Sequence, residues 1–506
     1  MTSNKLLFCV RLVGVFIIML IGALPVNAQF LRTSYFMEGT HYRQQLNPAL
    51  APTKGYFNFP VVGSLNATVG SSSLGYRDII DIIDNGDDFY TNPKFLGRLK
   101  DNNKLNVNFS TEILSAGWYK GKNFWSFNVG IRADIGANLT KSMFTFLSEM
   151  DELQNTWQNK KFEIDNQKLN INAFTEIGLG FSRQINNRLT VGAKVKALLG
   201  IGNLDLKINQ IYMNANLPSE ARIQEFSRME ITDMSQVEAL KKEIGDYRAK
   251  LAVGANLESS FKGLELTQKD GQDYVSDLDF DAGKLGVAGY GFGVDLGASY
   301  KILDNLTVSA SILDLGFISW SKESTKIGTA SGNIDMDGQT YVDKLSSATS
   351  LSEAQQIVNS FSNEAMDYLD RVGNGDVLNY EMLQLRTEDA QKSRKSRLAS
   401  TLVFGAEYGF FDNKLGLGVL STTRFVQPDA LTEVTLSANY RPKSWFNVAL
   451  SYSAIQSAGK SFGLGLKLGP LFVGTDYMFL GKNSNAVNGF VGISIPLGGK
   501  KYNKEG

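Results

Sequence analysis

The sequence predicts an all-β protein, a transmembrane antiparallel β-barrel of about 14 strands with an N-terminal plug and long extracellular loops that contain helices. Three observations predict it. Apolar and polar residues alternate in one short segment after another, an export signal precedes them, and short and long connections fall at opposite ends of the wall. Alternation alone would equally fit a soluble β-sandwich, but the export signal and the segregated connections favour the membrane.

Residues 1–28 have the pattern of a secretory signal peptide. Lys5 and Arg11 form a basic region, an apolar run follows, and Val26-Asn27-Ala28 provides a small-residue cleavage site. The apolar run is shorter than the ~20 residues that a membrane-spanning helix needs. Cys9 is the single cysteine and precedes the cleavage site, so we expect the exported chain to have neither disulfides nor thiol chemistry.

Residues 29–55 do not alternate cleanly, yet they are richer in aromatic and apolar side chains than a mobile tail normally is. We therefore expect this segment to fold into the barrel as a plug, with a mobile tail as the alternative. The motif Asn47-Pro48-Ala49, after an export signal and before the first strand, resembles the NPA motif in the hatch of FadL-like outer-membrane proteins. That superfamily includes transporters of long-chain fatty acids and aromatic hydrocarbons, and PorV-like proteins of type IX secretion.

The longer stretch from Leu31 to Pro52 resembles, more specifically, a family of Bacteroidota barrel proteins with an N-terminal Asn-Pro-Ala-Leu-Ala-Pro segment. The resemblance extends over essentially the whole exported chain through its strand plan. It carries over no ligand-contacting residue, because only the hatch motif and the strand plan match.

The barrel wall is predicted over residues 56–496. The candidate strands are residues 56–69, 104–119, 124–139, 168–184, 188–209, 287–301, 305–320, 396–411, 414–424, 431–440, 445–455, 461–468, 471–480 and 488–495. Short connections rich in Asn, Asp, Gly and Pro join each even strand to the next odd one. The long connections, 70–103, 140–167, 210–286 and 321–395, fall at the opposite end and are predicted to be outer loops.

An even number of strands places both chain ends in the periplasm, including a tail at 497–506, and the protein in the cell outer membrane. An additional alternating segment from Leu251 to Phe261 is assigned to the third long connection, since adding it to the wall would break this parity.

The wall face opposite the apolar set carries charges of both signs on sequential strands. Because an unpaired charge in a confined space is costly, we expect a paired network that stiffens the interior and anchors the plug; a polar permeation path is the alternative. The network comprises Glu112, Arg132, Asp134, Glu176, Lys194 and Lys196, with Asp295, Glu407, Arg424, Glu433, Lys467 and Asp476 on later strands. Inward glycines such as Gly297, Gly463 and Gly465 could admit the backbone of the plug or of a ligand, but we expect them to let the wall bend, which is the commoner reason.

The sequence offers little material for catalysis, and we predict that the protein is not an enzyme and has no cofactor. His41 is the sole histidine, so a Ser-His-Asp triad or a multi-histidine metal site has nothing else to draw on. Asn333, Asp335 and Asp337 have the spacing that begins a calcium loop, but the closing glutamate is missing, and a solvated acidic loop is the competing interpretation. The balance of 51 basic and 51 acidic residues gives no footprint for nucleic acid.

The resemblance to the FadL-like superfamily implies two candidate functions. The first is passive transport of a hydrophobic small molecule through a plugged barrel. The second, implied by the PorV-like members, is a docking or accessory subunit of an outer-membrane secretion or assembly complex. The expected partners are accordingly outer-membrane lipid, a hydrophobic small molecule, or other outer-membrane or periplasmic proteins.

Overall fold

The computed structural model describes most of the chain beyond the predicted signal peptide. The described residues are 32–58, 64–75, 78, 92–149, 161–268, 275–373, 386–389, 393–426, 430–455, 460–477 and 485–500. The signal peptide and the C-terminal residues 501–506 lie outside them.

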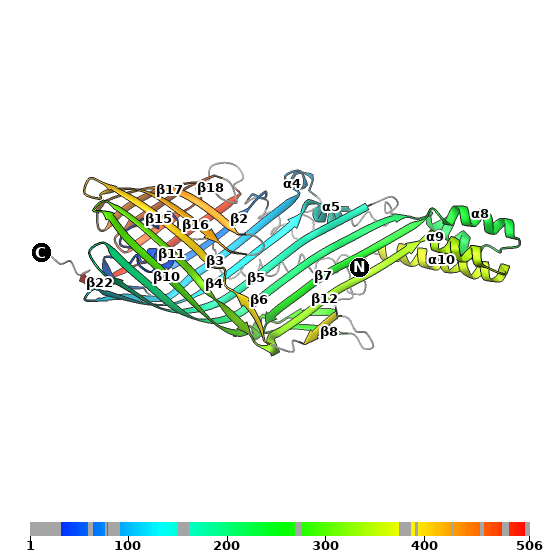
Figure 1. The fold of residues 1–506 in the computed structure, drawn as a ribbon, viewed down its shortest axis with the longest axis horizontal. Helices are drawn as coiled ribbons and strands as arrows, with labels where there is room; N and C mark the ends of the chain where they lie inside the picture. Colours follow the sequence, from blue (N-terminus) through cyan, green and yellow to red (C-terminus); the bar gives the residue numbers. More distant parts are fainter. Residues whose placement is uncertain are drawn as a thin grey trace.

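A closed antiparallel barrel of 14 strands forms the body of the protein, which confirms the predicted fold class and strand count (Figure 1). The first strand consists of β1 and β2, the eighth of β14 and β15, and the last of β21 and β22. The barrel closes where β1 pairs with both β22 and β3, and β2 pairs with β21.

The barrel strands have the following bounds: β1 (Lys54–Asn58), β2 (Ser64–Ser71), β3 (Asn102–Lys120), β4 (Asn123–Thr140), β5 (Lys161–Gln184), β6 (Leu189–Asn216), β10 (Gly289–Leu303), β11 (Leu306–Trp320), β14 (Arg394–Arg397), β15 (Thr401–Phe410), β16 (Leu415–Arg424), β17 (Leu431–Lys443), β18 (Phe446–Ile455), β19 (Ser461–Leu468), β20 (Leu471–Thr475), β21 (Ala486–Ile493) and β22 (Ile495–Lys500). Connections such as 121–122, 304–305 and 469–470 are short and define the turn end of the barrel. The opposite end, where connections such as 217–288 emerge, is the loop end.

An arm extends from the loop end, because β5 and β6 continue past the barrel as a pair and β6 pairs there with a further strand (Figure 1). β6 reaches Asn216, beyond the predicted end at 209, and its distal half pairs with β7 (Arg248–Phe261), the additional alternating segment. β12 (Thr325–Asp337) pairs with β7, and β13 (Arg386–Asp389) with β12. A small hairpin of β8 (Leu264–Gln268) and β9 (Val275–Phe280) lies beside this sheet.

Helices pack on the tip of the arm and give it a hydrophobic core of its own. The core includes Phe162, Met213, Phe226, Val358 and Phe361, all buried. The tip helices are α7 (Glu220–Arg228), α8 (Met234–Ile244), α9 (Gly338–Ser347) and α10 (Leu351–Gly373); the remaining helical elements are α2 (Tyr42–Leu46), α4 (Pro93–Leu96), α5 (Lys141–Glu149), η3 (Ala282–Lys284) and η4 (Lys322–Ser324). Of the helices described, none is long and apolar enough to cross a membrane.

Alternation along the barrel strands separates two chemically different faces. Large apolar side chains point outward and are exposed, for example Tyr290, Phe404 and Leu450. Charged side chains at alternate positions, such as Lys196 and Asp295, point inward and are buried. The wall is therefore apolar outside and polar inside, and the N-terminal segment 32–50 occupies the interior, where its aromatic residues Tyr35, Phe36 and Tyr42 are buried.

Candidate functional site inside the barrel

The first residues of the N-terminal segment 32–50, Arg32 and Thr33, bind to the barrel wall. Arg32 Nη1 lies 2.9 Å from Glu433 Oε2 of β17. The backbone amides of Arg32 and Thr33 donate to the Asp476 carboxylate at 3.1 and 2.7 Å, and Thr33 Oγ1 lies 2.6 Å from Ser451 Oγ of β18. Two acidic residues that the sequence placed on the inner face thus hold this segment.

Glycines on the inner face give the segment room to approach the wall. A Cβ added to Gly405 or Gly418 would lie 2.6 Å from the ring of Tyr35 or of Phe36, and one added to Gly465 would lie 2.8 Å from Met37 Sδ. Non-bonded carbon atoms need about 3.5–4.0 Å. At Gly465, where we expected bending of the wall, and at Gly405 and Gly418, the missing side chain thus makes room for the segment.

The Asn47-Pro48-Ala49 motif sits on a pair of glycines that face each other on adjacent strands, Gly192 of β6 and Gly297 of β10. A Cβ at Gly297 would overlap Asn47 Oδ1, and a Cβ at Gly192 would overlap the carbonyl carbon of Pro48. From this seat Asn47 Nδ2 donates to the carbonyl oxygens of Ala298 and Ala310, both at 3.2 Å, and Asn47 Oδ1 accepts from the Ala49 amide at 2.9 Å. The motif therefore joins the segment to β10 and β11.

His41 is buried between two aromatic rings and paired with a carboxylate. Its ring stacks on Tyr42 and Tyr56 with centroid distances of 4.9 and 4.8 Å. Its Nε2 lies 2.9 Å from Glu112 Oε2 of β3. Glu112, one of the six predicted network residues, thus contacts the N-terminal segment directly and lies apart from the ion pairs of the other five.

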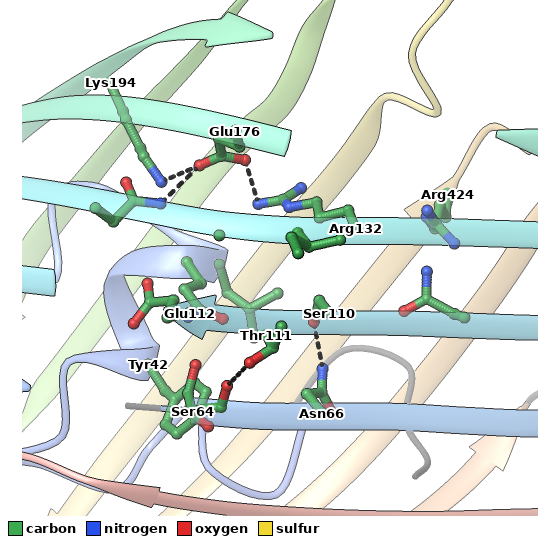
Figure 2. Close-up of a pocket in the computed structure, with 16 residues that line it drawn as sticks. Tyr42, Ser64, Asn66, Ser110, Thr111, Glu112, Arg132, Glu176, Lys194 and Arg424 are labelled. Atoms are coloured by element: carbon green, nitrogen blue, oxygen red, sulfur yellow. Dashed lines mark hydrogen bonds and ion pairs between the residues drawn. The ribbon is translucent and has the colours of Figure 1, made fainter. Parts of the chain in front are cut away.

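Four of the predicted network residues form one ionic cluster in the wall. Glu176 of β5 lies 2.9 Å from Arg132 and 2.6 Å from Lys194 (Figure 2). Lys196 lies 3.8 Å from the same carboxylate. Lys196 also pairs with Asp295 at 2.7 Å. The last of the six, Asp134, pairs instead with Arg424 of β16 at 2.7 Å, and so joins β4 to a strand far around the barrel.

Asp314 of β11 belongs to the ionic cluster, although simple alternation does not place it on the inner face. It lies 2.6 Å from Lys196 Nζ and 3.0 Å from Arg132 Nη1. A β-bulge sets Leu313 and Asp314 opposite the single residue Asp295, with φ of 57° at Asp314, and turns its carboxylate inward. An acidic residue inside an apolar run, between Leu313 and Leu315, is the sequence signal that points to such a bulge.

Later inward charges have separate partners. Glu407 pairs with Arg441 at 2.7 Å, and Lys467 donates to the Ser444 carbonyl at 2.7 Å.

The proposed calcium ligands Asn333, Asp335 and Asp337 lie along β12 in the arm. Asp335 pairs with Lys250 at 3.0 Å and Asp337 with Arg248 at 2.8 Å. In the described part of the chain, no group of three or more His, Cys, Asp or Glu side chains is placed to hold a metal ion.

A polar cavity separates the N-terminal segment from the wall on the side of β2 to β6. The space in it that water can occupy is about 50 Å³, and it is lined by Tyr42 and Gln45 of the segment and by wall residues including Asn66, Glu112 and Arg132 (Figure 2). A second such space, of about 20 Å³, lies next to it and reaches His41, Pro48 and Phe181. Gln45, Glu112, Asn128 and Lys194 line both spaces and therefore lie between them.

Among the described residues, the backbone ladder of the wall is sparse beside the cavity. β2 pairs with β21 from Ser64 to Gly70, but among the described residues its one backbone pair with β3 is Ser71 with Leu105. Side chains bridge this seam (Figure 2): Thr111 Oγ1 donates to the Ser64 carbonyl at 2.9 Å, and Asn66 Nδ2 to Ser110 Oγ at 3.4 Å. The buried Asn66 Oδ1, which lines the cavity, accepts no hydrogen bond from the described residues.

Three comparisons relate the chain to known proteins. A search of curated proteins found none that matches this chain. Among solved structures, the Pseudomonas putida toluene transporter TodX is 14% identical, with a TM-score of 0.39 and coverage of 94% of this chain and 99% of that chain. The Ralstonia pickettii toluene transporter TbuX is 8% identical (TM-score 0.38; 91% and 94%), and a Pseudomonas aeruginosa FadL homologue 9% identical (TM-score 0.39; 93% and 97%).

A family model matches residues 48–476, from the Pro48 of the hatch-like motif to the Asp476 that holds Arg32. The match takes in every strand of the barrel from β1 to β20, together with the arm. Because this is most of the chain, the protein belongs to the family of unknown function DUF5723.

Proposed function

We propose that this protein is an outer-membrane β-barrel that passes a small molecule through its interior when the N-terminal segment, acting as a plug, shifts. The observation that carries the proposal is how the plug is held. Arg32, His41 and Asn47 fasten it by ion pairs and hydrogen bonds to several strands, and polar cavities lie between it and the wall. Such contacts close the barrel and can be broken without unfolding it.

The exposed apolar outer face supports the membrane placement, since lipid would cover side chains such as Phe404 and Leu450. In this placement the turn end and both chain ends are periplasmic, and the arm is extracellular. Export through the signal peptide is part of the same proposal.

A hydrophobic small molecule is the cargo that we propose. Support for this choice comes from a cluster of buried apolar side chains beside the ionic cluster, Phe174, Leu198, Ile318 and Trp320, at inward positions of β5, β6 and β11. A polar cargo would instead follow the cavity lined by Asn66, Glu112 and Arg132. In the described residues, no contact or surface favours the alternative role as a docking subunit.

A reversible lock on the plug tests this function. Thr33 Oγ1 and Ser451 Oγ are 2.6 Å apart, so Thr33→Cys with Ser451→Cys brings two thiols within disulfide reach in an exported chain that we expect to have no other cysteine. Uptake of a labelled alkylbenzene and of a disaccharide would be measured in intact Gram-negative cells, with and without reductant. The two single variants serve as controls.

We expect the oxidised double variant to take up the alkylbenzene no faster than cells without the protein, and reductant to restore uptake. Uptake that is rapid and equal in the oxidised and reduced states would contradict plug movement. If reductant restored uptake of the disaccharide and not of the alkylbenzene, the cargo that passes through the cavity would be polar.

A further inference from the structure

Two exposed cations stand on the outward face of β14, at the loop end of the barrel. Lys395 and Arg397 are exposed, whereas the residues that alternate with them point inward. Arg394 pairs with Glu258 at 2.6 Å, and Ser396 accepts a hydrogen bond from Trp320 Nε1 at 2.8 Å. The alternation therefore separates one structural cation, which has a protein partner, from two that face the surroundings.

Exposed aromatic rings lie directly beside these cations. In the pairing of β14 with β11, Arg397 is opposite Phe317 and Lys395 is opposite Ser319. The Lys395 ammonium lies 5.2 Å from the centroid of the Phe317 ring. On the next strand, β10, Phe292 is opposite Phe317 and Tyr290 is opposite Ser319. These three rings are 42%, 51% and 69% exposed for Phe317, Phe292 and Tyr290.

The outer face changes character in order along these strands (Figure 1 shows β10, β11 and β15). Nearer the turn end, exposed aliphatic and aromatic residues such as Leu296 and Phe404 cover it. Toward the loop end come Phe292, Phe317 and Tyr290, and Arg397 and Lys395 lie level with these rings in the strand register. In membrane proteins, aromatic rings and cations stand together in this way at the interface between hydrocarbon and head groups, where long cationic side chains reach toward the head groups.

Neither cation is neutralised within the described residues: Lys395 has the Phe317 ring beside it, and no carboxylate lies within ion-pair distance of Lys395 or Arg397. Two cations two residues apart on one strand face are suited to a doubly charged anion. An arginine guanidinium binds phosphate through two parallel hydrogen bonds, and a lysine ammonium adds a point charge.

We propose that Lys395 and Arg397, with Phe317 and Tyr290 beside them, bind the phosphate group of a lipid in the membrane leaflet at the loop end. The acyl chains of that lipid cover the exposed rings of β10 and β11, and its head group is fixed by the two cations. This site would hold the barrel at a defined depth on the side where the arm leaves the membrane. The inference rests on the proposed membrane placement and is independent of any transport.

The test is lipid binding by the detergent-purified exported chain, measured by native mass spectrometry. The probes are phosphatidic acid and phosphatidylcholine with identical acyl chains, and inorganic phosphate as a competitor. We expect the wild type to retain phosphatidic acid in preference to phosphatidylcholine. Lys395→Gln with Arg397→Gln should weaken this binding about tenfold or more, because each cation near an anionic head group contributes about 1 kcal/mol.

Two matched variants make the result specific. Lys395→Arg with Arg397→Lys keeps both charges and should retain the lipid. Lys207→Gln with Lys250→Gln removes two exposed charges from the arm and should leave binding unchanged.

Equal retention of phosphatidic acid by the wild type and by the variant with Lys395→Gln and Arg397→Gln would overturn the proposal. Equal retention of the two lipids by the wild type would overturn it as well. Full displacement by millimolar inorganic phosphate would show a site for free phosphate. A protein that binds the lipid in this way but takes up no cargo would refute only the transport function.

Discussion

Gly297 of β10 lies so close to the side chain of Asn47 that a Cβ on the glycine would overlap Asn47 Oδ1. Gly192, its directly opposed partner on β6, is covered in the same way by Pro48. The hatch-like motif and these two glycines are therefore two halves of one contact. The motif can form its hydrogen bonds to Ala298 and Ala310 only because the wall has no side chains at this place.

Gly297→Ala should loosen the plug while the barrel remains folded. The added methyl group displaces Asn47 and removes its two bonds to β10 and β11, at about 1 kcal/mol each, so the plug should open about 30-fold more often. The measurement is the rate at which a water-soluble maleimide labels a Thr40→Cys reporter, since Thr40 is fully buried. Gly489→Ala is the control, because a Cβ there meets nothing within 4 Å. Equal labelling rates for Gly297→Ala and Gly489→Ala would show that the contact of Asn47 with Gly297 does not hold the plug.

His41→Phe separates the two contacts of His41. Phenylalanine keeps the stacking between Tyr42 and Tyr56 but leaves Glu112 without its partner at 2.9 Å. Because an unpaired buried carboxylate is costly, we expect faster labelling of the same Thr40→Cys reporter. Adding Glu112→Gln should reverse most of the effect, since it removes the unpaired charge. A double variant that labels faster than His41→Phe would show that the contact between His41 and Glu112 is not what holds the plug.

Lys196→Met should strongly destabilise the barrel. Lys196 is buried and pairs with both Asp295 and Asp314, so its loss leaves two buried carboxylates that share only the remaining cations, at a cost of about 3–5 kcal/mol. The free energy of unfolding would be measured by urea titration in lipid vesicles, followed by tryptophan fluorescence. Lys250→Met, which breaks the exposed pair with Asp335, should cost less than about 1 kcal/mol. Similar costs for the two variants would contradict a structural role for the ionic cluster.

The tip of the arm should lose stability in acid. Arg222 of α7 donates to Glu243 of α8 at 2.9 and 2.7 Å, and this hydrogen bonding lowers the pKa of the Glu243 carboxyl. A lowered pKa in the folded state means that the pair stabilises the tip above the ordinary glutamate pKa of about 4.3 and that this contribution disappears as the pH falls through the folded-state value. The pair is partly exposed, so the contribution should stay below about 1 kcal/mol.

Hydrogen exchange in the amides of α7 and α8 would measure this effect. Protection of the two helices should fall between pH 7 and pH 3 in the wild type, after correction for intrinsic exchange. Glu243→Gln should be less protected than the wild type at pH 7 and show a smaller fall. An identical pH response in the two proteins would exclude this pair as its source.

The alternation of side chains and the placement of turns determined the barrel. Both are local properties of the sequence, and they were sufficient to predict the 14 strands that the structure contains. The same alternation placed Glu176, Lys194 and Lys196 on one inner face. It could not indicate that β5 and β6 continue as an arm, because a strand that leaves the barrel has the same local pattern as one that stays.

Only the tertiary structure decided which inward residues meet. Arg32 contacts Glu433, Asp134 contacts Arg424, and Asn47 lies on Gly297, in each case across a long separation in sequence. Such contacts depend on the closure of the sheet and on the register of every strand between the two residues. A single bulge is enough to change them, as at Asp314, where one extra residue turns a carboxylate from the outer face to the inner one. Alternation in the sequence thus sets the face of a residue wherever the ladder is regular, and the closed wall, with its bulges, sets the partners.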